Sequence, residues 1–278
     1  MPALLVAFLP GDQYVSTIAR VGTYRVERQR DESDEIDTLT LRDRKGRAVT
    51  TIKNYRVGLL GINYPKGKSV RDLNRDGIPE VIFESWTGGA HGSQLYYLWS
   101  LGPKPVCRLA YDKGNVWGDE RDFTFVDLDR DGVPEIRTWY DGFAYQYGGA
   151  YSAHLPMILK WRNGRYVDAT RRFHSELEAA TEDARVGFEE RLKEGSVVSG
   201  RAAARLVALS ELTGRREETF SSLKKRLRKD DYDWIKAEVP HIRNVVRARH
   251  GRLRYPRAYS ARVEDSLDFP ARPDPPNR

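Results

Sequence analysis

The sequence predicts an α+β protein, in which a β-rich repeat domain of about three units occupies residues 1–170 and a helical region follows it. Three observations carry this prediction. Hairpin signals recur at a regular spacing, an acidic loop occurs twice with nearly the same sequence, and the periodicity of the apolar residues becomes helical after residue 170. The 278 residues are enough for one large core or for two ordinary domains.

Three hairpin signals define the β-rich part. The segments 38–52, 95–110 and 156–170 each contain two strand-like runs around a turn that is rich in Gly, Pro or Asn. The third turn contains Asn163-Gly164, and Asn-Gly is the strongest short-range signal for a two-residue hairpin turn. Because an acidic loop lies between successive hairpins, we expect an internal repeat with several strands in each unit.

The segment 171–250 is predicted to be an α-helical extension. Apolar residues recur at three- and four-residue steps between Phe173 and Leu192, and further amphipathic segments follow. Pro240 should interrupt the last helix, because proline lacks the backbone N–H that a helix interior uses. Residues 251–278 are rich in Pro and Arg and have no periodicity, so we expect a disordered or loosely packed tail.

The two acidic loops, Asp72–Glu80 and Asp127–Glu135, share one pattern of oxygen-bearing residues. Positions 1, 3, 5 and 9 carry side-chain oxygens, position 7 offers its backbone carbonyl, and position 6 is the glycine that a sharp turn favours. Calcium takes six to eight oxygen ligands, so we expect each loop to hold one calcium ion, which makes two ions in the chain. The predicted ligands are Asp72, Asn74, Asp76, Ile78, Glu80, Asp127, Asp129, Asp131, Val133 and Glu135.

The alternative is a pair of acidic surface turns without metal. Four carboxylates crowded into the second loop would then repel each other, which favours the metal interpretation. The first loop has three carboxylates and Asn74, so the second loop is expected to bind more tightly. An EF-hand is excluded, because its twelfth position must be a bidentate Glu, and Phe83 and Thr138 stand there.

These loops and the strands around them resemble the FG-GAP and VCBS repeats of integrin-like β-propellers. The resemblance covers about residues 70–170, and it implies calcium-binding blades, an extracellular or periplasmic location and a role in binding. Three units are too few for a ring of four or more blades, so we expect a partial β-propeller-like arrangement. The first ten residues lack the basic segment of a signal peptide and are expected to form a strand.

The favoured function is a calcium-binding module with a non-enzymatic binding or scaffolding role. The sequence has no G-x-S-x-G, no H-E-x-x-H and no other catalytic constellation, although a hydrolase that uses the repeat platform remains an alternative. Glycine-aromatic segments after both loops either pack between units or contact a protein or glycan. The candidate contact residues are Trp86, His91, Phe143, Tyr145, Tyr147 and Tyr151.

Charge and cysteine content limit the possible partners and cross-links of the chain. The net charge is +7 and the basic excess lies in the C-terminal part, so an anionic polymer, either a nucleic acid or an acidic glycan, is a further alternative partner. Interleaved acidic residues disfavour nucleic acid. The single cysteine, Cys107, rules out an internal disulfide and is expected to be a buried, inert thiol. No apolar run is long enough to span a bilayer, and the oligomeric state stays open.

Overall fold

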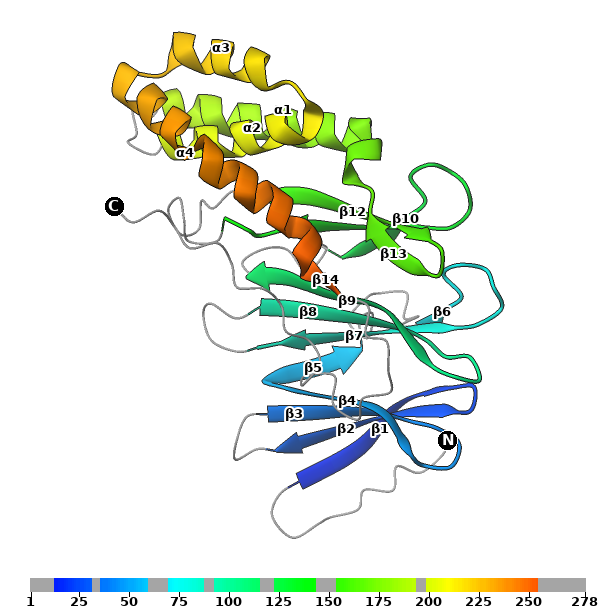
Figure 1. Cartoon of the computed structure of the whole chain (residues 1–278). Coiled ribbons are helices and arrows are strands. Elements are labelled where there is room, and N and C mark those ends of the chain that lie inside the picture. Colours follow the sequence, from blue (N-terminus) through cyan, green and yellow to red (C-terminus); the bar gives the residue numbers. More distant parts are fainter. Residues whose placement is uncertain are drawn as a thin grey trace. The chain divides into compact units, whose positions relative to one another are not determined.

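The computed structural model describes residues 13–31, 36–59, 70–87, 93–115, 123–143, 154–193 and 199–254. This part of the chain has an α+β fold with three antiparallel sheets and four α-helices after them (Figure 1), which confirms the predicted class. Its residues form two compact units. The division falls inside the β-rich segment 1–170, which the sequence predicts to be one domain.

The first unit contains residues 13–115, the turn 163–165 and residues 253–254 of the described chain. Its first sheet has the strand order β1-β2-β3-β4, formed by Gln13–Val21, Tyr24–Asp31, Ile36–Arg42 and Ala48–Asn54. Its second sheet has the order β14-β9-β8-β7-β5, and β6 also pairs with β7. These strands are β5 Arg56–Leu59, β6 Val70–Arg71, β7 Glu80–Trp86, β8 Ser93–Ser100, β9 Val106–Asn115 and β14 Leu253–Arg254.

The two sheets of the first unit share one apolar core. Leu39 and Leu41 alternate with more exposed residues along β3 and are completely buried, as a strand with one inward face requires. Phe83 of β7 and Trp99 of β8 belong to the same buried cluster. Burial of each such side chain stabilises the fold by about 1.5–3 kcal/mol. Cys107 also lies in this core, where burial raises the pKa of its thiol to about 12.

The second unit contains residues 123–162 and 166–252 of the described chain. Its sheet has the order β10-β11-β12-β13, formed by Thr124–Val126, Glu135–Tyr140, Leu155–Arg162 and Arg165–Asp168. The helices are η3 Thr170–Arg172, α1 His174–Lys193, α2 Ser199–Thr213, α3 Arg216–Arg226, α4 Lys229–Ala248 and η4 Arg249–Arg252. Helices α1 and α2 pack on β12, where Ile158 and Phe173 share a small apolar cluster.

The three predicted hairpins are confirmed, and each belongs to a different sheet. They correspond to β3–β4, β8–β9 and β12–β13. In the last of them Asn163 and Gly164 have φ values of 49° and 81°, the left-handed pair that a tight hairpin turn needs. The segments from β6 to β9 and from β10 to β13 therefore repeat one plan: a short strand, an acidic loop, a longer strand and a hairpin.

The predicted interruption at Pro240 is wrong, because α4 continues through it. Pro240 and Lys236, whose carbonyl loses its helical partner, are both on the exposed side of the helix, where water can replace the missing donor. Ile235 and Ile242 are completely buried on either side of the proline and hold both halves of α4 in place. Within the described residues, no helix has the length and apolarity needed to cross a membrane.

The segment predicted to be a loose tail, 251–278, begins with ordered residues. Leu253 is buried and lies opposite Tyr111 of β9, so that β14 forms an edge strand of the second sheet. The rest of the predicted tail, residues 255–278, lies outside the described residues.

Candidate functional site

Both acidic loops connect adjacent antiparallel strands. Asp72–Glu80, called loop 1, joins β6 to β7, and Asp127–Glu135, called loop 2, joins β10 to β11. The strand pairs Arg71–Glu80 and Val126–Glu135 close the two loops. This pairing brings the first and ninth positions of each loop together, although seven residues separate them in sequence.

The two loops have the same backbone winding. Position 4 is left-handed in both, with φ of 59° at Arg75 and 61° at Arg130. Position 6 is also left-handed, with φ of 82° at Gly77 and 88° at Gly132. Glycine adopts this conformation at little cost, whereas any other residue is strained there. The glycine expected from the sequence is thus required by the backbone in both loops.

In loop 1 the side chains turn back onto the loop's own backbone. The carboxylate of Asp72 accepts hydrogen bonds from the N–H groups of Asp76 at 3.1 Å and Gly77 at 2.9 Å. Asp76 accepts one from the N–H of Ile78 at 2.8 Å and another from the side-chain amide of Asn74 at 2.8 Å. The oxygens at positions 1, 3 and 5 are therefore gathered on one side of the loop.

Glu80 forms the buried floor of loop 1. The residue is 1% exposed, its Oε2 accepts a hydrogen bond from the N–H of Leu73 at 2.7 Å, and its Oε1 accepts one from Ser100 Oγ at 2.5 Å. Burial raises the pKa of Glu80, the two hydrogen bonds oppose this, and the nearby Asp76 and Asp72 carboxylates raise the pKa further. A cation beside Glu80 would relieve the cost of its buried charge.

Loop 2 repeats these hydrogen bonds. Asp127 accepts from the N–H of Gly132 at 2.9 Å, and Asp131 accepts from the N–H of Val133 at 2.9 Å. Glu135 is completely buried, and its Oε2 accepts from the N–H of Leu128 at 2.8 Å. The structure thus brings the side chains predicted as ligands together within each loop, and it places Ile78 and Val133 at equivalent positions.

One residue of the site was not singled out from the sequence: Lys160 of β12. Its ammonium donates hydrogen bonds to Asp129 Oδ2 at 2.7 Å, Asp131 Oδ2 at 2.7 Å and Glu135 Oε1 at 2.8 Å. Its side chain is only 12% exposed. Burial lowers the pKa of Lys160, but the three carboxylates outweigh this and hold its pKa above the usual range. The ammonium therefore lies where three side chains of loop 2 converge.

The donor set fits a hard divalent cation. One oxygen from each of Asp127, Asp129 and Glu135 lies within 4.8 Å of the others, close enough to share one ion. All side-chain donors of both loops are carboxylate or amide oxygens, which calcium prefers. In loop 2, however, the ammonium of Lys160 already contacts two of these three carboxylates.

Of the candidate contact residues, the structure describes Trp86, which is partly buried, and Phe143, which is buried. Trp86 makes an edge-to-face contact with Tyr55, with ring centroids 5.1 Å apart, and Arg56 lies 5.2 Å from the centre of the Trp86 ring. Phe143 is completely buried. These observations favour a packing role for Trp86 and Phe143. The other candidate contact residues, His91, Tyr145, Tyr147 and Tyr151, lie outside the described residues.

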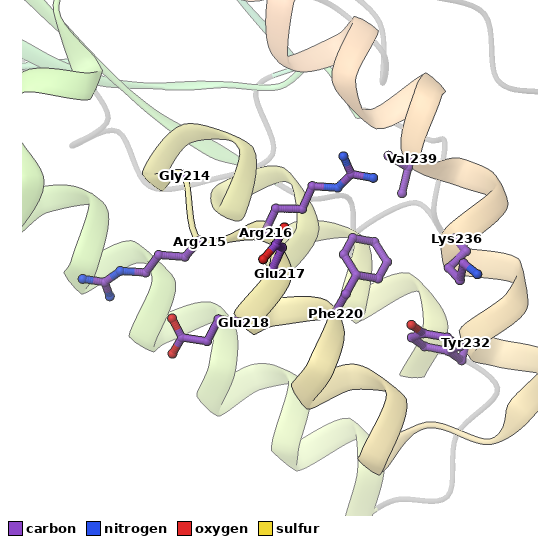
Figure 2. Close-up of a pocket in the computed structure, with 9 residues that line it drawn as sticks. All are labelled: Gly214, Arg215, Arg216, Glu217, Glu218, Phe220, Tyr232, Lys236 and Val239. Atoms are coloured by element: carbon purple, nitrogen blue, oxygen red, sulfur yellow. The ribbon is translucent and has the colours of Figure 1, made fainter.

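A groove of about 900 Å³ lies between α3 and α4 (Figure 2). Phe220 and Tyr232 meet edge to face in it, with centroids 6.3 Å apart. Arg215 pairs with Glu178 at 3.0 Å and Arg216 pairs with Glu211 at 3.6 Å. Because its described lining contains three cationic and two acidic side chains, the groove favours no particular class of ligand.

A second pocket, of about 310 Å³, has a strongly basic lining and is called the arginine pocket. Among the described residues that line it, Asp168 is the only acidic one; it pairs with the buried Arg249 at 2.7 Å, and His250 Nδ1 lies 3.1 Å from its Oδ2. Burial lowers the pKa of His250, and the coulombic effect of Asp168 opposes this. The remaining lining residues are Arg162, Ala169, Thr170, Arg171, Arg172, Val246 and Arg247.

Comparison of the chain with protein-family models, with curated proteins and with solved structures gives no match. The geometry of the loops and pockets is therefore the basis for inferring the function of this chain.

Proposed function

We propose that the chain is a calcium-binding β-repeat module with a non-enzymatic binding or scaffolding role, in which calcium orders the acidic loops of the repeats. The observation that carries this proposal is the shared winding of loops 1 and 2. Both place oxygen-bearing side chains at positions 1, 3 and 5 beside a buried glutamate at position 9. A turn with only a structural role would need neither the repeated carboxylates nor the buried glutamate charge.

The proposal extends to the arrangement and the partner that the FG-GAP and VCBS resemblance implies. The three four-stranded or larger antiparallel sheets are of the kind that propeller blades use, which supports a partial β-propeller-like arrangement. A protein or a glycan is the proposed partner. An extracellular or periplasmic location suits weak calcium sites, for which dissociation constants of about 10⁻⁴–10⁻³ M suffice. No specific observation favours the hydrolase alternative.

Thermal unfolding in calcium and in EGTA tests the proposal. A ligand that binds only the folded state stabilises it by about 2.7 kcal/mol at a concentration of 100 times its dissociation constant, so calcium should raise the Tm by several degrees. Asp76→Ala in loop 1 should reduce this shift. Glu190→Gln, which removes an exposed carboxylate of α1, is the matched control and should leave the shift unchanged. If the Tm is the same in calcium and in EGTA, the proposal is refuted.

The arginine pocket favours a second candidate function, the binding of an anionic polymer. Within the described residues Arg172 and Arg247 are exposed and have no carboxylate partner, and Asp168 is already saturated by Arg249, Thr170 and His250. Guanidinium groups pair well with phosphate and sulfate oxygens. The expected ligand is thus a polymer that carries phosphate or sulfate ester groups.

Salt-dependent retention on heparin and on single-stranded DNA tests this second candidate. Arg172→Ala with Arg247→Ala should elute at lower salt, because fewer counterions are released on binding. The control, Lys224→Ala with Lys225→Ala, removes the same charge from the exposed face of α3. Equal losses in both double variants would show a nonspecific charge effect and exclude the pocket. Retention on heparin alone would assign a sulfated glycan, and retention on DNA a nucleic acid.

A further inference from the structure

We infer that Lys160 is a built-in replacement for the second calcium ion, so that loop 2 is closed by the protein's own ammonium and loop 1 is the exchangeable calcium site. This inference rests on the proposed calcium function and refines it. It reverses the order of affinities expected from counting carboxylates, because that count does not include a cation from another strand. The chain then binds one calcium ion, in loop 1.

The strand register places Lys160 and Ser100 at the same position of the repeat. In the first unit Glu80 of β7 lies directly opposite Ser100 of β8. In the second unit Ile136 of β11 lies opposite Leu159 of β12, so the preceding residue of β11, Glu135, faces Lys160. Each unit thus offers one side chain from the neighbouring strand to the floor of its loop. This side chain is the short hydroxyl of Ser100 in the first unit and the long, positively charged side chain of Lys160 in the second.

The two partners use the same oxygen of the loop glutamate. Glu80 Oε1 accepts from Ser100 Oγ at 2.5 Å, and Glu135 Oε1 accepts from Lys160 Nζ at 2.8 Å. In both glutamates Oε2 is held by the N–H at position 2 of the loop. The serine hydroxyl ends at the glutamate. The lysine ammonium continues to Asp129 and thereby reaches the side chains at the top of the loop.

The residue at position 3 also differs between the two loops, and this difference accompanies the exchange of Ser100 for Lys160. Loop 1 has Asn74, whose amide nitrogen donates to Asp76 Oδ2 at 2.8 Å. Loop 2 has Asp129, and there Lys160 donates to the equivalent oxygen, Asp131 Oδ2, at 2.7 Å. The additional carboxylate of loop 2 is therefore matched by an additional cation, and both loops keep the same excess of negative charge.

An ion and the ammonium cannot occupy loop 2 together. Calcium binds its oxygens at about 2.3–2.6 Å, and Lys160 Nζ already contacts three loop carboxylates at 2.7–2.8 Å. Calcium would have to displace a nearly buried ammonium and break three charge-assisted hydrogen bonds, which are stronger than hydrogen bonds between neutral groups. In loop 1 the corresponding side chain, Ser100, reaches only Glu80. The space between the oxygens at positions 1, 3 and 5 is therefore left for an ion.

Exchange of the two cross-strand residues tests the inference on the full chain. Calcium binding is measured by isothermal titration, and hydrogen exchange of peptides that cover residues 70–87 and 123–140 locates each ion. The wild type should bind one ion, with calcium-dependent protection only in the 70–87 peptide. Lys160→Ser should add a second site in the 123–140 peptide, with an affinity at least about tenfold above that of wild-type loop 2. Ser100→Lys should abolish binding in loop 1.

Each result separates this inference from the proposed function. Absence of calcium binding from the wild type and from both variants would refute the calcium function itself. Two ions in the wild type, or a Lys160→Ser variant that still binds one ion, would refute the role of Lys160 and leave the calcium function in place. If Lys160→Ser unfolds in EGTA, recovery of its wild-type Tm in calcium counts for the inference, and failure to recover at millimolar calcium counts against it.

Discussion

Lys160 Nζ lies 2.8 Å from Glu135 Oε1, and the two side chains are 12% and 0% exposed. An ion pair at a protein surface contributes little, because water screens both charges. Here the glutamate is fully withdrawn from solvent, so its charge depends on the ammonium. The pair joins β11 to β12 at the end of loop 2, where the sheet would otherwise contain an uncompensated carboxylate.

Replacement of Lys160 by methionine should therefore destabilise the second unit without calcium. Methionine keeps the apolar stem and removes the charge, and the loss of one partner of a buried pair costs about 3 kcal/mol. The free energy of unfolding, measured by urea titration in EGTA, checks this. Lys225→Met, at an exposed position of α3, is the control and should change it by less than about 0.5 kcal/mol. If Lys160→Met also lowered the free energy of unfolding by less than about 0.5 kcal/mol, the stabilising role of the buried pair would be contradicted.

The loop glycines give a prediction whose control has the opposite sign. Gly77→Ala and Gly132→Ala should each lower the free energy of unfolding by about 1–2 kcal/mol, because alanine is strained at φ of 82° or 88°. Gly187→Ala, inside α1 with open space around its Cβ position, should raise it by about 0.5–1 kcal/mol. Chemical denaturation in EGTA measures all three. If Gly77→Ala does not lower the free energy of unfolding, the backbone of loop 1 does not have the described left-handed conformation at this position.

Asp168 and Arg249 predict a pH dependence. Burial raises the pKa of Asp168, but the coulombic effect of Arg249 and the hydrogen bonds from Thr170 and Arg249 outweigh it and hold the pKa below the ordinary 3.8. A depressed carboxylate pKa contributes stability that is complete above the unfolded value and is lost as the pH falls through the folded value. Asp168→Asn should thus cost about 3 kcal/mol at pH 7. Unfolding curves should show the cost shrinking below pH 3.8. A cost that stays constant down to pH 2 would contradict the depressed pKa.

Pro240 gives a prediction of increased stability. It occupies the interior of α4, where proline costs about 3 kcal/mol relative to alanine when nothing compensates. Since the side chain is exposed, Pro240→Ala should raise the free energy of unfolding by about 1–3 kcal/mol and the Tm with it. Differential scanning calorimetry measures the change. Ala237→Pro, at another exposed position of the same helix, should do the reverse.

The sequence predicted what local chemistry determines. Asn163-Gly164 marks its own turn, and the spacing of carboxylates around Gly77 and Gly132 marks the two loops before any tertiary contact is known. Lys160 could not be found this way, because only the pairing of β11 with β12 brings it to Glu135. The continuation of α4 through Pro240 was missed for a similar reason, since buried residues on both sides override a local penalty. The pairing of β14 with β9 also depends on residues distant in sequence.

The pairing of β14 with β9 has a consequence for how the protein is made. The last strand of the first unit's second sheet, β14, is synthesised only after residues 123–252 of the second unit. Until then β9 presents an open edge, which nascent chains can join wrongly. Rapid folding of the helices of the second unit, whose backbone hydrogen bonds are local, would shorten the interval in which this edge is open.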